Sequence, residues 1–187
     1  MGLRFSGLGA RQKADHWLFH LAGAAAGGAA IGATLGTIGA LLSLGDRRVW
    51  VAALAAAVAI AVAFTAWGRE FGRHRQVPRR WGRTMRHRNA FLLWGVLLGS
   101  GIATLIPYSS LLLLLGLQLA AGPVIGGAAG ATYGLARESM TLVTTFRRMD
   151  EGAIMDVLER FALSGPRANA VLSIGGGMAA LAVAALG

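Results

Sequence analysis

The sequence predicts an all-α, polytopic integral membrane protein, and three observations support this fold class. Of the 187 residues, 55% are hydrophobic and 14% are charged, whereas a soluble domain carries about a quarter charged residues. The charged residues are gathered into a few segments, and the uncharged runs between them are long enough for membrane-spanning helices. In two of these runs glycines recur every four residues, a spacing typical of closely packed membrane helices. We therefore expect a single membrane domain over residues 1–187.

Five membrane-spanning helices are expected, because charge, glycine or proline interrupts the apolar sequence at four points between them. The expected spans are 17–44, 49–67, 90–106, 111–136 and 168–186. The first span is longer than the about 20 residues that a bilayer requires, so it should tilt or protrude. Residues 107–110 are expected to turn at the far membrane face. The Gly122-Pro123 pair is expected to bend or unwind the fourth span locally.

Two charged segments are expected on the cytoplasmic side of the membrane. Segment 68–89 is the more basic one, and its arginines are expected to contact anionic lipid or a protein partner. Segment 137–167 carries acidic residues and apolar residues at helical spacing, so it should form one or two amphipathic helices that do not span. Ser164-Gly165-Pro166 is expected to end this segment. The lipid- or partner-facing arginines of the basic segment are Arg73, Arg75, Arg79, Arg80, Arg83 and Arg86.

The charge distribution predicts orientation and excludes some functions. The formal net charge is +10, and arginine next to apolar spans orients a membrane protein, so nucleic-acid binding is not indicated. Positive charge near span ends places the N-terminus in the cytoplasm and the C-terminus outside. The Ala-, Gly- and Arg-rich composition is typical of a bacterial inner-membrane protein. The chain contains no cysteine, which excludes disulfides and thiolate metal sites.

Two glycine-rich segments resemble each other and predict an inverted repeat. Leu21–Gly36 (LAGAAAGGAAIGATLG) aligns without gaps with Leu119–Gly134 (LAAGPVIGGAAGATYG). In the expected topology these segments run in opposite directions, as the repeats of many secondary transporters do. The counterpart of the second span, 138–163, is too charged to span, so the repeat is degenerate; the alternative is that Gly/Ala-rich spans match by composition alone. The expected helix-packing glycines are Gly28, Gly32, Gly36, Gly122, Gly126, Gly130 and Gly134.

One stretch resembles a known family. Gly95–Gly134 combines a Gly-rich third span, a short turn and a Gly-Pro-x-x-Gly fourth span. In these features it resembles the membrane domain of the bacterial thiol-electron transporters of the cytochrome-c-biogenesis (DsbD-like) group. The resemblance implies a scaffold of inverted three-helix repeats. It implies no thiol chemistry, because Pro123-Val124 and Ala25-Ala26 occupy the region of that family's cysteines.

Two sets of polar residues are candidate sites. His16 and His20 share a helix face at the start of the first span, where they could bind a metal ion or haem iron, or could simply lie among lipid headgroups. Thr34 and Thr132 hold equivalent repeat positions. With Tyr133 and Pro123 they could line a polar pathway, or each threonine could bond to its own or a neighbouring helix.

The motifs favour a non-enzymatic protein. No ionisable residue lies inside an expected span except at the ends, which argues against proton-coupled transport. There is no nucleophile elbow, P-loop or dinucleotide fingerprint. We therefore expect an accessory or scaffold subunit of a membrane complex, with a protein partner or a second copy of the chain and no cofactor. The alternatives are a small transporter or permease and a haem- or metal-binding membrane redox protein.

Overall fold

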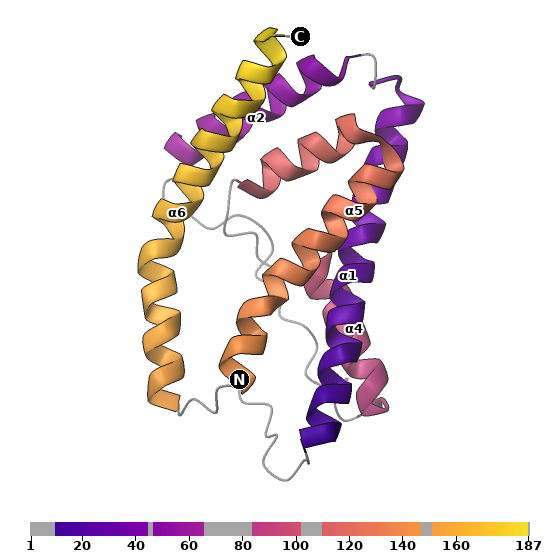
Figure 1. Ribbon diagram of the computed structural model, residues 1–187, viewed down its shortest axis with the longest axis vertical. Helices are drawn as coiled ribbons and strands as arrows, with labels where there is room; N and C mark the ends of the chain where they lie inside the picture. The colour runs from indigo at the N-terminus through magenta and orange to yellow at the C-terminus, as the bar shows by residue number, and fades with distance from the viewer. Residues whose placement is uncertain (1–9, 45–46, 66–83, 102–109, 147–150, 187) are drawn as a thin grey trace.

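The fold is built from helices alone within the part of the chain that is described. A computed structural model describes residues 10–44, 47–65, 84–101, 110–146 and 151–186, which contain no strand. Its helices are α1 (Ala10–Leu41), α2 (Arg48–Thr65), α4 (His87–Gly99), α5 (Ser110–Phe146) and α6 (Glu151–Leu186) (Figure 1). The prediction of an all-α fold is confirmed. Stretches of two helices, Ala14–Leu41 and Ser110–Ser139, are long and apolar enough to cross a membrane.

The centre of the molecule is a tight bundle of α1, α4 and the C-terminal part of α5 (Figure 1). Helix α4 runs parallel to α1, since Gly95 packs against the backbone of His20 and Ala24, and Gly99 packs against Ala24. The C-terminal part of α5 runs antiparallel to α1. Glycine is required at these contacts because the helix backbones touch directly.

Helix α5 folds back on itself at Gly122 instead of crossing as a straight rod. Gly122 has φ 78° and ψ 170°, a conformation open to glycine, and Pro123 follows it. A Cβ at Gly126 would lie 3.3 Å from the Gln118 carbonyl oxygen, although eight residues span about 12 Å along a straight helix. The prediction of a break at Gly122-Pro123 is therefore confirmed. The expected span 111–136 contains this break, so α5 does not run through it as one straight helix.

We call residues 110–121 the first limb of α5 and residues 123–146 the second limb. The first limb is about 18 Å long, too short to cross a bilayer alone. It begins next to the end of α4, where a Cβ at Gly101 would lie 3.4 Å from a Leu111 methyl group. The start of the first limb therefore lies close to the end of α4. The turn expected at 107–110 lies outside the described residues except for Ser110, which begins the first limb.

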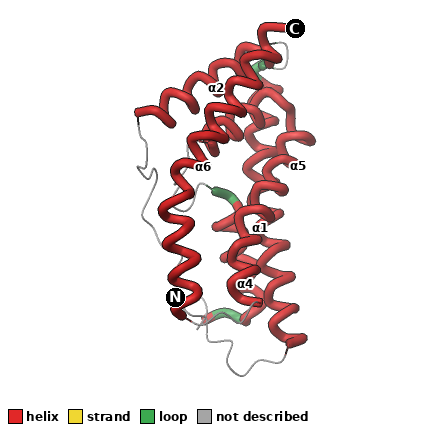
Figure 2. The backbone as a smooth tube through the Cα atoms, turned by 60° about the vertical axis from the view of Figure 1, so that its left-hand side comes forward, coloured by secondary structure: helices red, strands yellow, loops and turns green. Residues whose placement is uncertain are grey.

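Helices α2 and α6 pack beside this centre. Helix α2 lies obliquely across the end of the bundle at which α1 ends, and Gly177 of α6 packs against Ile60 of α2 (Figures 1 and 2). Asn169 of α6 joins α6 to α5, because its side-chain oxygen accepts a hydrogen bond of 3.0 Å from the Ser110 backbone N–H. This bond caps the start of the first limb.

The charged segment 137–167 differs from its prediction. Residues 137–146 continue α5, and residues 151–167 begin a helix that continues unbroken to Leu186. The expected end at Ser164-Gly165-Pro166 is wrong. Proline removes one helical N–H, but this Ser-Gly-Pro sequence is accommodated here without a break in the helix. The Ser164 hydroxyl donates to the Arg160 carbonyl of its own helix at 2.6 Å.

Candidate functional site

Glycines of α1 and of the second limb face one another along the central contact. A Cβ placed on Gly28 would overlap the Gly130 carbonyl oxygen, and a Cβ on Gly32 would overlap that of Gly126. The gap-free alignment of the two segments pairs Gly28 with Gly126 and Gly32 with Gly130. If the segments 21–36 and 119–134 are exchanged, the Gly28–Gly130 contact becomes the Gly126–Gly32 contact. An inverted pair of repeats requires this relation.

The same contact continues beyond the glycines to a buried polar pair. Positions ascend by four along α1 while they descend by four along α5, so His20 meets Glu138. The facing residues are His20, Ala24, Gly28, Gly32 and Gly36 of α1, and Glu138, Gly134, Gly130, Gly126 and Gly122 of α5.

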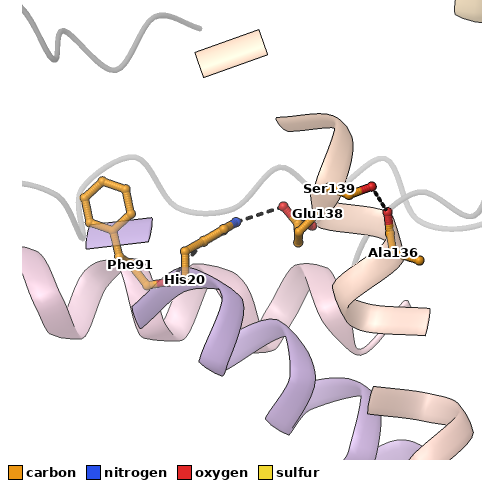
Figure 3. Close-up of polar contacts among 5 residues, drawn as sticks. All are labelled: His20, Phe91, Ala136, Glu138 and Ser139. Atoms are coloured by element: carbon orange, nitrogen blue, oxygen red, sulfur yellow. Dashed lines mark hydrogen bonds and ion pairs between the residues drawn. The ribbon is translucent and has the colours of Figure 1, made fainter. Parts of the chain in front are cut away.

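His20 and Glu138 form the candidate functional site. The His20 Nε2 atom lies 2.8 Å from a Glu138 carboxylate oxygen, and the residues are 5% and 3% exposed (Figure 3). On the other side of the ring, Nδ1 lies 3.2 Å from the Phe91 carbonyl oxygen of α4. A single imidazole thus bridges two acceptors on different helices, and Trp17 packs edge-on against it with ring centroids 5.3 Å apart.

Neither residue of this pair lies at a helix end, because α1 begins at Ala10 and α5 continues to Phe146. His20 and Glu138 therefore lie about 12–15 Å inside their helices, at 1.5 Å per residue. Each neutralises part of the desolvation cost of the other, which explains how a carboxylate can be buried there. Ionisable groups buried in apolar helices are rare and usually functional.

A second group of titratable side chains lies one turn nearer the start of α1. We call Asp15, His16, His87 and Arg88 the outer cluster. The His16 ring stacks on Phe91, with ring centroids 4.9 Å apart, and lies 5.8 Å from the His87 ring. Asp15 accepts a hydrogen bond of 3.3 Å from Arg88 at the exposed edge.

The structure directs the two candidate metal ligands to different partners. His16 stacks on Phe91, whereas His20 is held between Glu138 and the Phe91 carbonyl. Among the described residues there is no group of three or more His, Cys, Asp or Glu side chains placed to hold a metal ion.

The other predicted site residues lie apart from one another. The Thr34 and Thr132 hydroxyls are exposed and donate to carbonyls of their own helices, at 2.7 and 3.0 Å. The structure does not bring these threonines together. Tyr133 borders a small cavity, and Pro123 is exposed at the reversal. Arg86 is exposed at the start of α4, and the remaining arginines of the basic segment lie outside the described residues.

Comparisons with known protein families, with characterised proteins and with solved structures found no match. The resemblance of Gly95–Gly134 to the thiol-electron transporters therefore stays a prediction. The function has to be argued from the geometry of the His20–Glu138 pair and of the broken helices around it.

Proposed function

We propose that this protein is a small membrane transport protein that moves protons through the His20–Glu138 pair. The observation that carries the proposal is the burial of an imidazole and a carboxylate, 2.8 Å apart, between two antiparallel apolar helices. Both groups bind and release protons, and intramembrane pairs of this type occur in proton relays of pumps and transporters.

We propose that protons enter through the outer cluster. In this proposal a proton passes from His16 and His87, near the start of α1 and α4, to His20 or Glu138. The 2.8 Å separation allows direct transfer between these two groups, since it is a hydrogen-bond distance.

The broken helices give a second reason to favour transport. Transporters place their binding sites at discontinuous helices, because unwound backbone can face a polar cavity there. In this chain the reversal at Gly122 adjoins the central bundle, because a Cβ on Gly36 of α1 would overlap the Gly122 backbone. We further propose that the chain lies in a bacterial inner membrane with its N-terminus in the cytoplasm.

Proton flux into vesicles tests the proposal. We expect purified protein in liposomes that contain a pH-sensitive dye to collapse an imposed pH gradient faster than empty liposomes do. Glu138→Gln removes the titratable group while keeping shape and hydrogen-bonding capacity, so the flux should fall at least tenfold. Asp156→Asn, the matched change at an exposed carboxylate of α6, should leave the flux unchanged.

A wild-type flux equal to that of empty liposomes would contradict proton transport and favour the second candidate function, an accessory subunit of a membrane complex. One observation favours this alternative. Large apolar side chains of α2 and α6 are exposed, and a partner helix or lipid would cover them: Trp50, Leu54, Val171 and Leu172. A stoichiometric partner retained in mild detergent would support it.

A further inference from the structure

A small, partly open cavity lies between α1, the end of α4 and the two limbs of α5. Its polar side chains are Ser100, Gln118 and Tyr133, and the glycines Gly28 and Gly130 form part of its wall. The space is about the size of one water molecule. It is a separate place from the His20–Glu138 pair, further along the central bundle.

Gln118 brings an unsatisfied polar atom to this cavity. The residue is 2% exposed, and its side-chain oxygen has no hydrogen-bond partner within the described part of the chain. A buried acceptor without a donor costs about 1–3 kcal/mol, and nearly all such groups in folded proteins are satisfied by protein or by ordered water. If the amide is turned, its N–H₂ group faces the cavity, and this group needs a partner too.

The remaining polar groups define what can occupy the cavity. The Tyr133 hydroxyl oxygen accepts a hydrogen bond of 3.2 Å from Arg137, which leaves its proton to donate. The Ser100 hydroxyl donates to the Leu97 carbonyl at 2.8 Å, which leaves its oxygen to accept. The occupant must therefore accept one hydrogen bond and donate two, which suits water and neither an anion nor a metal cation.

We infer that the Gln118–Tyr133–Ser100 cavity binds one ordered water molecule. We infer further that protons pass through this water as well as through the His20–Glu138 pair. The inference about the path rests on the proposed function, whereas the water site does not. Three hydrogen bonds are typical of a buried water. On the second limb, the Arg137 side chain donates to the Tyr133 hydroxyl, which then donates to the water shared with Gln118.

The internal repeat points to the same residue. Extending the alignment of Leu21–Gly36 with Leu119–Gly134 by one position pairs His20 with Gln118. Both side chains are buried, at 5% and 2% exposure, and both lie between helices of the central bundle. One repeat position therefore carries a titratable imidazole, and the other carries a neutral amide that binds water. The two positions differ in their ability to take up a proton.

A double-mutant cycle tests the water site without any transport measurement. Tyr133→Phe removes only the hydroxyl group, and Gln118→Leu removes only the amide. Because the two side chains share the water, the double variant should lower the midpoint of thermal unfolding no further than the more damaging single variant does. Additive shifts, or a higher midpoint in Gln118→Leu, would show a dry cavity and overturn the inference.

Flux then tests the role of the water. In a wild type that conducts protons, we expect Gln118→Leu and Tyr133→Phe each to lower the flux at least tenfold, and the double variant to be no slower than either. Thr132→Val, at the neighbouring exposed hydroxyl that bonds its own helix, is the matched control and should conduct normally. Normal flux in Gln118→Leu would contradict a role of this water in proton transport. A wild type without flux would refute the proposed function, and the thermal cycle alone would then decide the water site.

Discussion

Replacing Gly130 by leucine should prevent the protein from folding. The Gly130 carbonyl lies against Gly28, and a Cβ on Gly130 would overlap the Gly28 carbonyl oxygen in return. A leucine side chain must push the two backbones apart, and the flanking contacts of Gly32 with Gly126 and of Ala24 with Gly134 separate with them. We expect a loss of about 3 kcal/mol or more in the free energy of unfolding. The measurement is the monodisperse fraction in mild detergent and the midpoint of its thermal unfolding.

Gly175→Leu is the matched control for this prediction. Gly175 lies in α6, and a Cβ at this position would meet nothing within 4 Å. The same substitution there should leave yield and unfolding midpoint close to those of the wild type. If Gly130→Leu behaved like Gly175→Leu, the close approach of α1 to α5 would be refuted.

Replacing Glu138 by leucine should have the second-largest effect on stability. The substitution leaves the His20 imidazole buried without its carboxylate partner, and breaking a buried pair in this way costs about 3–5 kcal/mol. Glu138→Gln should cost less, since its amide oxygen can still accept a hydrogen bond from the His20 ring. The free energy of unfolding in detergent measures both effects.

Neighbouring and compensating variants separate the pair from the rest of α5. Ser139→Ala is the local control, because the Ser139 hydroxyl is exposed and bonds the Ala136 carbonyl of its own helix at 2.6 Å (Figure 3). Adding His20→Leu to Glu138→Leu should recover part of the lost stability, since the orphaned imidazole is removed. Equal effects of Glu138→Leu and Ser139→Ala would show that the pair does not hold the helices together.

Local features of the fold could be predicted from the sequence. Apolar runs predicted helices, and Gly122-Pro123 predicted a break, because proline and a positive-φ glycine act on the backbone where they stand. The direction of the chain after the break could not be predicted in this way. It depends on the packing of Leu111, Gln118 and Tyr133 around one cavity, which joins residues far apart in the sequence.

His20 could be predicted as a candidate site residue, but its pairing with Glu138 could not, because hydropathy describes each helix separately. His20 and Glu138 each lie near the edge of an apolar run, so each one alone resembles a residue at a helix end. A signal was present in the four-residue spacing. Continued past Gly28, the series on α1 reaches His20, and continued past Gly134, the series on α5 reaches Glu138. Two series that run antiparallel in register must bring these last members together.

Helix α1 and the second limb of α5 run antiparallel in the register that joins His20 to Glu138. Because the chain contains no cysteine, introduced cysteines can test this register in native membranes. A Cβ at Gly127 would lie 3.4 Å from the Ala33 Cβ, close to the about 3.5–4.5 Å of a disulfide. The measurement is the loss of free thiols, detected by a mass-tagged maleimide, after mild oxidation of the Ala33→Cys, Gly127→Cys double variant.

We predict an intramolecular disulfide in this double variant and none in Ala33→Cys, Leu135→Cys, in which the second cysteine is moved two turns, about 12 Å, along α5. Free thiols that persist in the first variant, or a disulfide that forms equally in both, would contradict the register and with it the site built on it.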